Sequence, residues 1–174
     1  ELRSATNNGT VVATRQALVQ RDGDVVMADG TSPVVMNVPP GNYYLAMLHR
    51  NHLGCMTLTT RTLGSTAVAV DLSATAPTMF GTDARKVSGG VALLWAGNVV
   101  LDGRLAYTNQ DNDRDPILSA IGGVVPTATV MGYRAEDVNL DGTVKYTGSG
   151  NDRDPILTNI GGVVPTNVRL EQLP

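Results

Sequence analysis

The chain has 174 residues, of which 42% are hydrophobic and 17% are charged, and its formal net charge is −3. Such a composition can bury a core and fits one large domain or two small ones. The acidic balance and the lack of a basic run argue against nucleic acid or an anionic membrane surface as a partner. No apolar run approaches the roughly 20 residues of a membrane span, so we expect no membrane insertion.

Residues 1–94 have the pattern of short strands separated by tight turns. Asp22-Gly23, Asp29-Gly30 and Pro39–Asn42 are turn sequences. The expected strands lie within residues 10–20, 25–30, 34–38, 43–48, 56–63 and 65–73. Five or more short strands at this spacing favour a β-sandwich.

The strand after the Pro/Gly turn carries a family resemblance. Val38, Gly41 and Tyr43 follow the spacing seen in prealbumin-like sandwich modules of bacterial surface proteins, the carboxypeptidase-regulatory-like and collagen-adhesin B-type modules. The first 72 residues resemble these modules, which are mostly spacers and stalks. The resemblance implies that residues 1–3 are the end of a first strand, so that either preceding residues or another element would complete this edge. The abrupt start at Glu1 also suggests a processed or partial product of a longer secreted precursor.

From Trp95 onward the chain repeats itself at an offset of 39 residues. The windows 107–127 and 146–166 match at 16 of 21 positions without a gap. Each copy contains a loop, a short helical pattern and the string IGGVVPT, in which Gly-Gly is typical of a helix end. We therefore expect a second domain over 95–174, with repeats at about 96–130 and 135–169.

The loop of the second repeat has the first half of a calcium-binding pattern. Asp137, Asn139 and Asp141 place oxygen side chains at positions 1, 3 and 5, and Gly142 permits a sharp bend. The backbone carbonyl of Thr143, at position 7, can add a ligand. Calcium takes six to eight oxygens at about 2.3–2.6 Å, which this set begins to supply.

The acid that closes the calcium shell is displaced in this loop. Position 12 is Gly148, which has no oxygen side chain, and an insertion of four to six residues brings Asp152 or Asp154 instead. Either carboxylate could also cap the following helix, because both place Pro155 in the first turn, where it removes no helical hydrogen bond. The sequence leaves the choice between the two open.

The loop of the first repeat is a weaker version of the same pattern. Asn98 and Asp102 occupy positions 1 and 5, and Val100 stands where a third oxygen side chain would be. The matching late acids are Asp113 and Asp115, and Asp111 is an additional acid. The missing ligand at Val100 predicts a lower affinity, or replacement of that ligand by water or a backbone carbonyl.

Two tandem loops, each followed by one helix, resemble the dockerin type I domain over about 96–174. The resemblance implies two calcium ions and a cohesin-like partner, although the loops are enlarged and the helices are short. The implied ligands are Asp137, Asn139, Asp141, Thr143, Asp152 or Asp154, Asn98, Asp102, Arg104 through its carbonyl, and Asp113 or Asp115. The chain looks closer still to the dockerin-like C-terminal regions of secreted Bacteroidetes proteins, which implies an extracellular location.

The remaining candidates favour structural roles. His49 and His52 would face opposite sides of a strand, with no acid nearby in sequence. Arg114 and Arg153 are expected to pair with neighbouring carboxylates. Cys55, the single cysteine, lacks a third group that would orient His52 as a base for it. No motif for hydrolysis, zinc or phosphate binding is present, so we expect neither an enzyme nor a small-molecule substrate.

These observations favour a mainly β, extracellular, calcium-stabilised structural protein. It would be a module of a cell-surface protein or a subunit that assembles with copies of itself. Two alternatives remain: a dockerin-type module that binds a cohesin-like protein, and an adhesin or carbohydrate-binding module. The aromatic residues for the last are few, mainly Tyr43, Tyr44 and Trp95.

Overall fold

The computed structural model describes residues 1–76 and 78–174. The protein is mainly β, with 28% of residues in strands and 8% in helices. Two compact units are present. Unit 1 comprises Glu1–Met47, Cys55–Leu93 and Leu173–Pro174, and unit 2 comprises Leu48–Gly54 and Leu94–Gln172. Neither helix of the described chain is long and apolar enough to cross a membrane.

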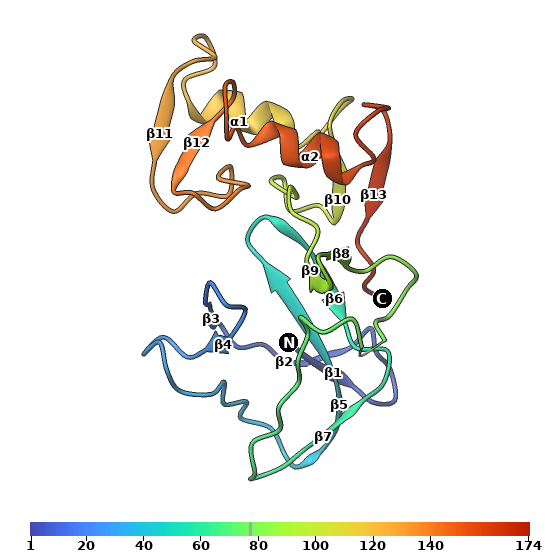
Figure 1. Ribbon diagram of the computed structural model, residues 1–174. Coiled ribbons are helices and arrows are strands. Elements are labelled where there is room, and N and C mark those ends of the chain that lie inside the picture. Colours follow the sequence, from blue (N-terminus) through green and yellow to red (C-terminus); the bar gives the residue numbers. More distant parts are fainter. Residues whose placement is uncertain (77) are drawn as a thin grey trace. The chain divides into compact units, whose positions relative to one another are not determined.

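Unit 1 is built on a five-stranded sheet (Figure 1). Its strands are β1 (Leu2–Ser4), β2 (Val11–Ala13), β5 (Gly41–His49), β6 (His52–Met56) and β7 (Arg61–Leu63). The order is β2-β1-β5-β6, and β7 also pairs with β5. Strand β1 is antiparallel to both β2 and β5, which leaves β2 at an edge of the sheet.

Two small hairpins complete the strands of unit 1. One joins β3 (Leu18–Val19) to β4 (Val25–Val26), and the other joins β8 (Lys86–Ser88) to β9 (Val91–Leu93). The expected Asp22-Gly23 turn connects β3 and β4, and Gly23 has a φ of 97° there, which suits glycine.

Two expected strands are absent from the described chain. Residues 34–38 and 65–73 form no strand, so these predictions were wrong. In the second run, one oxygen of Asp71 accepts the backbone N–H groups of Ser73 and Ala74. This Asx turn replaces a ladder of strand hydrogen bonds, although the apolar residues alternate as they would in a strand.

Unit 2 contains four strands, two helices and residues 48–54, which are the adjoining ends of β5 and β6 with the turn between them. Its elements are β10 (Arg104–Ala106), α1 (Arg114–Ala120), β11 (Thr129–Met131), β12 (Thr143–Lys145), α2 (Arg153–Asn159) and β13 (Val168–Leu170). Figure 1 shows the two helices beside each other, and they are in contact.

The two repeats of unit 2 exchange their contacts reciprocally. The strand after the first loop, β10, pairs with the exit strand of the second repeat, β13, while β12 pairs with β11. Helix α1 packs on β12, and α2 packs on β10. The hydroxyl of Thr108 donates to the carbonyl of Pro165, and that of Thr147 donates to the carbonyl of Pro126, both at 2.9 Å. The repeats are therefore halves of one folded unit.

A shared apolar core explains this reciprocity. Its fully or nearly fully buried members come from both repeats: Val99, Ile117, Ile121, Val138, Val144 and Ile156. A helix of two turns is not stable by itself in water, because nucleation costs more than so few hydrogen bonds return. Each helix thus depends on apolar side chains that the other repeat supplies.

Candidate functional site

The loop of the second repeat folds around its own side-chain oxygens. Asp137, only 2% exposed, accepts the backbone N–H of Asp141 on Oδ1 at 3.1 Å and that of Gly142 on Oδ2 at 3.0 Å. Asn139 Oδ1 also accepts from Asp141 N, at 2.9 Å. Asp141 Oδ1 accepts from the N–H of Thr143, the first residue of β12, at 2.9 Å. The residues at positions 1, 3 and 5 therefore converge on one tight turn.

The two late acids of this repeat occupy different places. Asp152 is fully buried, and its carboxylate accepts backbone N–H groups of Val138 at 2.8 Å, Asn139 at 3.2 Å and Lys145 at 2.7 Å. The side chain of Asp154 is 65% exposed and lies 3.8 Å from the guanidinium of Arg153. Of the two candidates, Asp152 is the one that lies against the loop.

The first repeat reproduces this arrangement. Asp113 is fully buried and accepts the N–H of Val100 at 3.1 Å and that of Ala106 at 2.9 Å. The side chain of Asp115 is 60% exposed and pairs with Arg114 at 2.9 Å. The expectation that Arg114 and Arg153 pair with neighbouring acids is thus confirmed. Asp102 accepts the N–H of Arg104 at 2.9 Å.

Asparagine side chains, not aspartates, cap both helices. Asp113 and Asp152 are the residues before α1 and α2, but neither makes a side-chain capping hydrogen bond. Instead, Asn112 Oδ1 accepts the N–H of Asp115, and Asn151 Oδ1 accepts that of Asp154, both at 3.0 Å. Asp113 and Asp152 are consequently left for the loops that precede the helices.

Burial perturbs the two inward-facing acids. Removal from water raises the pKa of Asp113 to about 6, against the hydrogen bonds from Ala106 and Val100, which lower it. Burial also raises the pKa of Asp152, and the nearby charge of Asp137 adds to this shift. Both carboxylates would be stabilised by a cation beside them, because opposite charge favours the ionised form.

Asn98, at position 1 of the first loop, has an unsatisfied oxygen. The residue is 3% exposed, and its Oδ1 accepts no hydrogen bond within the part of the chain that the structure describes. Its counterpart Asp137 accepts two backbone N–H groups. A buried amide oxygen without a donor costs about 1–3 kcal/mol, so this atom fits a role as a metal ligand.

The predicted ligands do not form a closed metal shell. Among the described residues, no three His, Cys, Asp or Glu side chains gather as they would around a metal ion. One reason is that Asp141 Oδ2 points to Lys145 Nζ, at 3.6 Å, and that Asn139 Nδ2 donates to the carbonyl of Gly150. The inner acids meanwhile bind backbone N–H groups.

Both loops store backbone strain at equivalent positions. Leu101 has a φ of 60° and Leu140 a φ of 63°, a left-handed conformation that costs a non-glycine residue roughly 1–2 kcal/mol. Asn109 and Asp111 are also left-handed, whereas the second repeat has glycine at both equivalent positions. Strain that recurs at one position of two loops is typical of a functional constraint.

A turn that the sequence did not assign to this site contacts the second loop. Arg50 Nη2 lies 3.6 Å from Asp137 Oδ2, and Arg50 Nε donates to the carbonyl of Arg134 at 3.1 Å. Asn51, fully buried, donates from Nδ2 to the carbonyls of Ala135 at 2.9 Å and Asp137 at 2.7 Å. No local pattern links residues 50–51 to 134–137, since the contact spans more than 80 residues.

The same turn brings the two histidines together. We expected His49 and His52 to face opposite sides of one strand. They lie instead on two strands, because the chain turns at Arg50-Asn51 between β5 and β6. Their Nδ1 atoms are 2.9 Å apart, and His52 Nδ1 is 2.7 Å from Asn51 Oδ1. Burial lowers the pKa of His52 to about 3. His52 is therefore neutral at physiological pH, which suits a structural contact.

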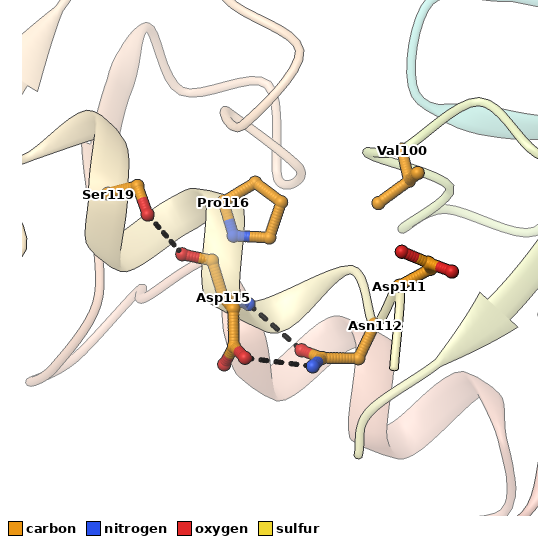
Figure 2. A pocket seen from close by; sticks show the side chains of 6 residues that line it. All are labelled: Val100, Asp111, Asn112, Asp115, Pro116 and Ser119. Carbon is orange, nitrogen blue, oxygen red and sulfur yellow. Dashed lines mark hydrogen bonds between the residues drawn. The ribbon is translucent and has the colours of Figure 1, made fainter. Parts of the chain in front are cut away.

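An open pocket of 430 Å³ lies beside the first loop (Figure 2). It is lined by Val100, Asp111, Asn112, Asp115, Pro116 and Ser119. Asp115 faces Asn112, whose Nδ2 donates to its Oδ2 at 2.9 Å. The pocket is thus a shallow, acidic surface at the start of α1.

Comparisons of the chain with models of known protein families, with curated proteins and with solved structures found no match.

Proposed function

We propose that this protein is an extracellular structural protein whose tandem loops are held in shape by calcium. The observation that carries the proposal is the buried Oδ1 of Asn98, which accepts no hydrogen bond from any described residue. It stands at position 1 of a loop that also contains the buried carboxylate of Asp113. Together they supply oxygen ligands, which a hard cation such as calcium prefers. This proposal also includes the calcium ligands, the dockerin-like module and the β-sandwich that the sequence predicts.

In this proposal, calcium replaces backbone N–H groups as the partner of the inner acids. Asn98, Asp102 and Asp113 serve the first loop, and Asp137, Asn139, Asp141 and Asp152 serve the second, with backbone carbonyls of Arg104 and Thr143. Asp115 and Asp154 stay on the surface beside their arginines. The ion would neutralise buried carboxylates and fix loops that hold strained residues, which adds to folding stability because the unfolded chain has no such site.

Thermal unfolding of the full chain in calcium and in chelator tests this. An ion at 100 times its dissociation constant stabilises by about 2.7 kcal/mol per site, and each kcal/mol shifts the melting temperature of such a unit by about 4–8 °C. We expect a rise above about 10 °C in calcium and a smaller rise in magnesium, which demands a tighter octahedral shell. An equal melting temperature in calcium and chelator would overturn the calcium proposal.

A matched pair of variants locates the late ligand. Asp152→Asn should lower the calcium-induced shift by about half, because one loop loses its inner acid. Asp154→Asn, two residues away but at the surface, should leave the shift unchanged. The reverse result would make Asp154 the calcium ligand in place of Asp152. If neither variant changes the calcium-induced shift, these acids only accept hydrogen bonds from the backbone and bind no calcium.

Assembly through a sheet edge is the second part of the proposal. It is supported by β2, an edge strand on which Val11 and Val12 are each 45% exposed. Exposed apolar edge strands invite pairing with another chain. Light scattering should show oligomers that Val12→Lys dissociates, whereas Val87→Lys, at an exposed site in β8, should have no effect. A wild-type monomer at all concentrations would exclude self-assembly.

A further inference from the structure

The two loops differ in charge at position 1, and among the described residues a cation lies beside that position only in the second loop. At position 5 the loops are alike, because Asp102 lies 3.5 Å from Arg104 and Asp141 lies 3.6 Å from Lys145. The second loop begins with the anionic Asp137, whose Oδ2 lies 3.6 Å from the guanidinium of Arg50. The first loop begins with the neutral Asn98, whose Oδ1 has no partner within the described chain. The presence of the cation thus matches the presence of the charge, and without metal both positions are close to neutral.

Arg50 is held in place by contacts on several sides. Its Nε donates to the carbonyl of Arg134, and its guanidinium carbon lies 4.0 Å from the ring centroid of Tyr133. The adjacent Asn51 fixes the backbone of the turn through its two hydrogen bonds to Ala135 and Asp137. The side chain of Arg50 is only 20% exposed. A cation fixed in this way interacts more strongly with a carboxylate than a mobile surface arginine does.

We propose that Arg50 is a built-in counter-ion of the second loop that competes with calcium for Asp137. The inference rests on the proposed function, in which Asp137 is the first calcium ligand. A divalent ion on this carboxylate would lie beside a fixed guanidinium, and the two cations repel each other. Calcium therefore binds with the loss of the Arg50–Asp137 contact, and this linkage lowers the affinity of the second loop. Among the described residues, no cation competes in this way at position 1 of the first loop, where Asn98 carries no charge.

Calorimetric titration of the full chain with calcium tests the competition. The heat of the second loop is identified as the component that Asp152→Asn removes. Arg50→Gln should tighten the dissociation constant of that component by about tenfold, a change of about 1.4 kcal/mol. Arg50→Met, a second neutral variant that keeps an apolar stem over Tyr133, should do the same. Arg134→Gln, which removes an exposed positive charge three residues before the loop, should change it by less than about threefold.

Two further measurements distinguish competition between Arg50 and calcium for Asp137 from a general effect of the Arg50 substitution on the protein. In chelator, Arg50→Gln should lower the melting temperature, because Asp137 loses its counter-ion. In an Asp137→Asn background, Arg50→Gln should no longer change calcium affinity, because the charge for which both cations compete is gone. Unchanged or weaker calcium binding by both neutral Arg50 variants would overturn the inference alone. Absence of calcium binding by the wild type would overturn it together with the proposed function.

Discussion

Replacing Asn98 with aspartate gives the first loop the charge that the second loop has at Asp137. The substitution preserves shape and adds a carboxylate where only 3% of the residue is exposed. At the equivalent position, Asp137 has two backbone donors and Arg50 beside it. Asn98 Oδ1 has no donor among the described residues. The new carboxylate would therefore be buried without a partner, which is strongly destabilising.

The loss of folding stability caused by Asn98→Asp has an upper bound, because the new carboxyl group can take up a proton and become neutral. Keeping an Asp with an ordinary pKa of about 3.9 protonated at pH 7 costs about 4 kcal/mol, at about 1.4 kcal/mol per pH unit. With the site almost fully buried, we expect a loss of about 3 kcal/mol in chelator at pH 7. Burial raises the pKa of the new carboxyl in the folded state, so the folded state binds more protons. The loss should then shrink to about 1.5 kcal/mol or less at pH 5.

Urea unfolding at pH 7 and pH 5, in chelator and in calcium, measures the stability that Asn98→Asp removes under each condition. Calcium should restore most of the lost stability, because the ion neutralises the added charge and gains a stronger ligand. Asn37→Asp is the control, since it makes the same chemical change at an exposed residue outside both loops and should cost less than about 0.5 kcal/mol. A loss below about 1 kcal/mol in chelator, or one that calcium fails to restore, would refute the assignment of Asn98 to a metal site.

Four further substitutions test the fold and the pH dependence of its stability. The raised pKa of Asp113, about 6, means that the calcium-free folded state holds a proton that the unfolded chain releases near pH 4. Stability in chelator should thus fall by up to about 3 kcal/mol as pH rises from about 4 through 6, and Asp113→Asn should flatten this decline in urea titrations. Gly97→Ala should cost about 3 kcal/mol or more by thermal unfolding, because its Cβ would lie 2.8 Å from Ile156 Cγ1 at a φ of 122°. Gly122→Ala, at a φ of 102° with open space around it, should cost only about 1 kcal/mol, and equal losses would exclude the steric explanation. Asp111→Gly, which copies Gly150 of the second repeat, should add about 0.5–1 kcal/mol because Asp111 has a φ of 54°, and an unchanged urea midpoint would show that this strain is negligible.

Local sequence patterns predicted those parts of the structure that depend on residues close together in the chain. The repeat offset identified the equivalent residues of both loops, and the Asp-Pro string located both helix starts. The alternating apolar residues at 65–73 wrongly predicted a strand. Asp71 instead accepts hydrogen bonds from the backbone of its own turn, and the alternation gives no sign of this turn. The separation of Asp152 from Asp154 also needed the fold. Either residue fits a helix start, and the helix capping role fell to Asn151 instead.

The sequence by itself determined that unit 2 is a tandem repeat, that its loops concentrate oxygen side chains, and that its helices are short. These properties follow from residue types at fixed spacing. Only the tertiary structure decided that each repeat pairs with the exit strand of the other and that Arg50 and Asn51 reach the second loop. Contacts across more than 80 residues depend on which surfaces bury apolar side chains together, and no local pattern encodes that choice. For the same reason, the motif alone does not determine the burial that raises the pKa of Asp113 and leaves Asn98 Oδ1 without a hydrogen-bond partner in the described parts of the chain.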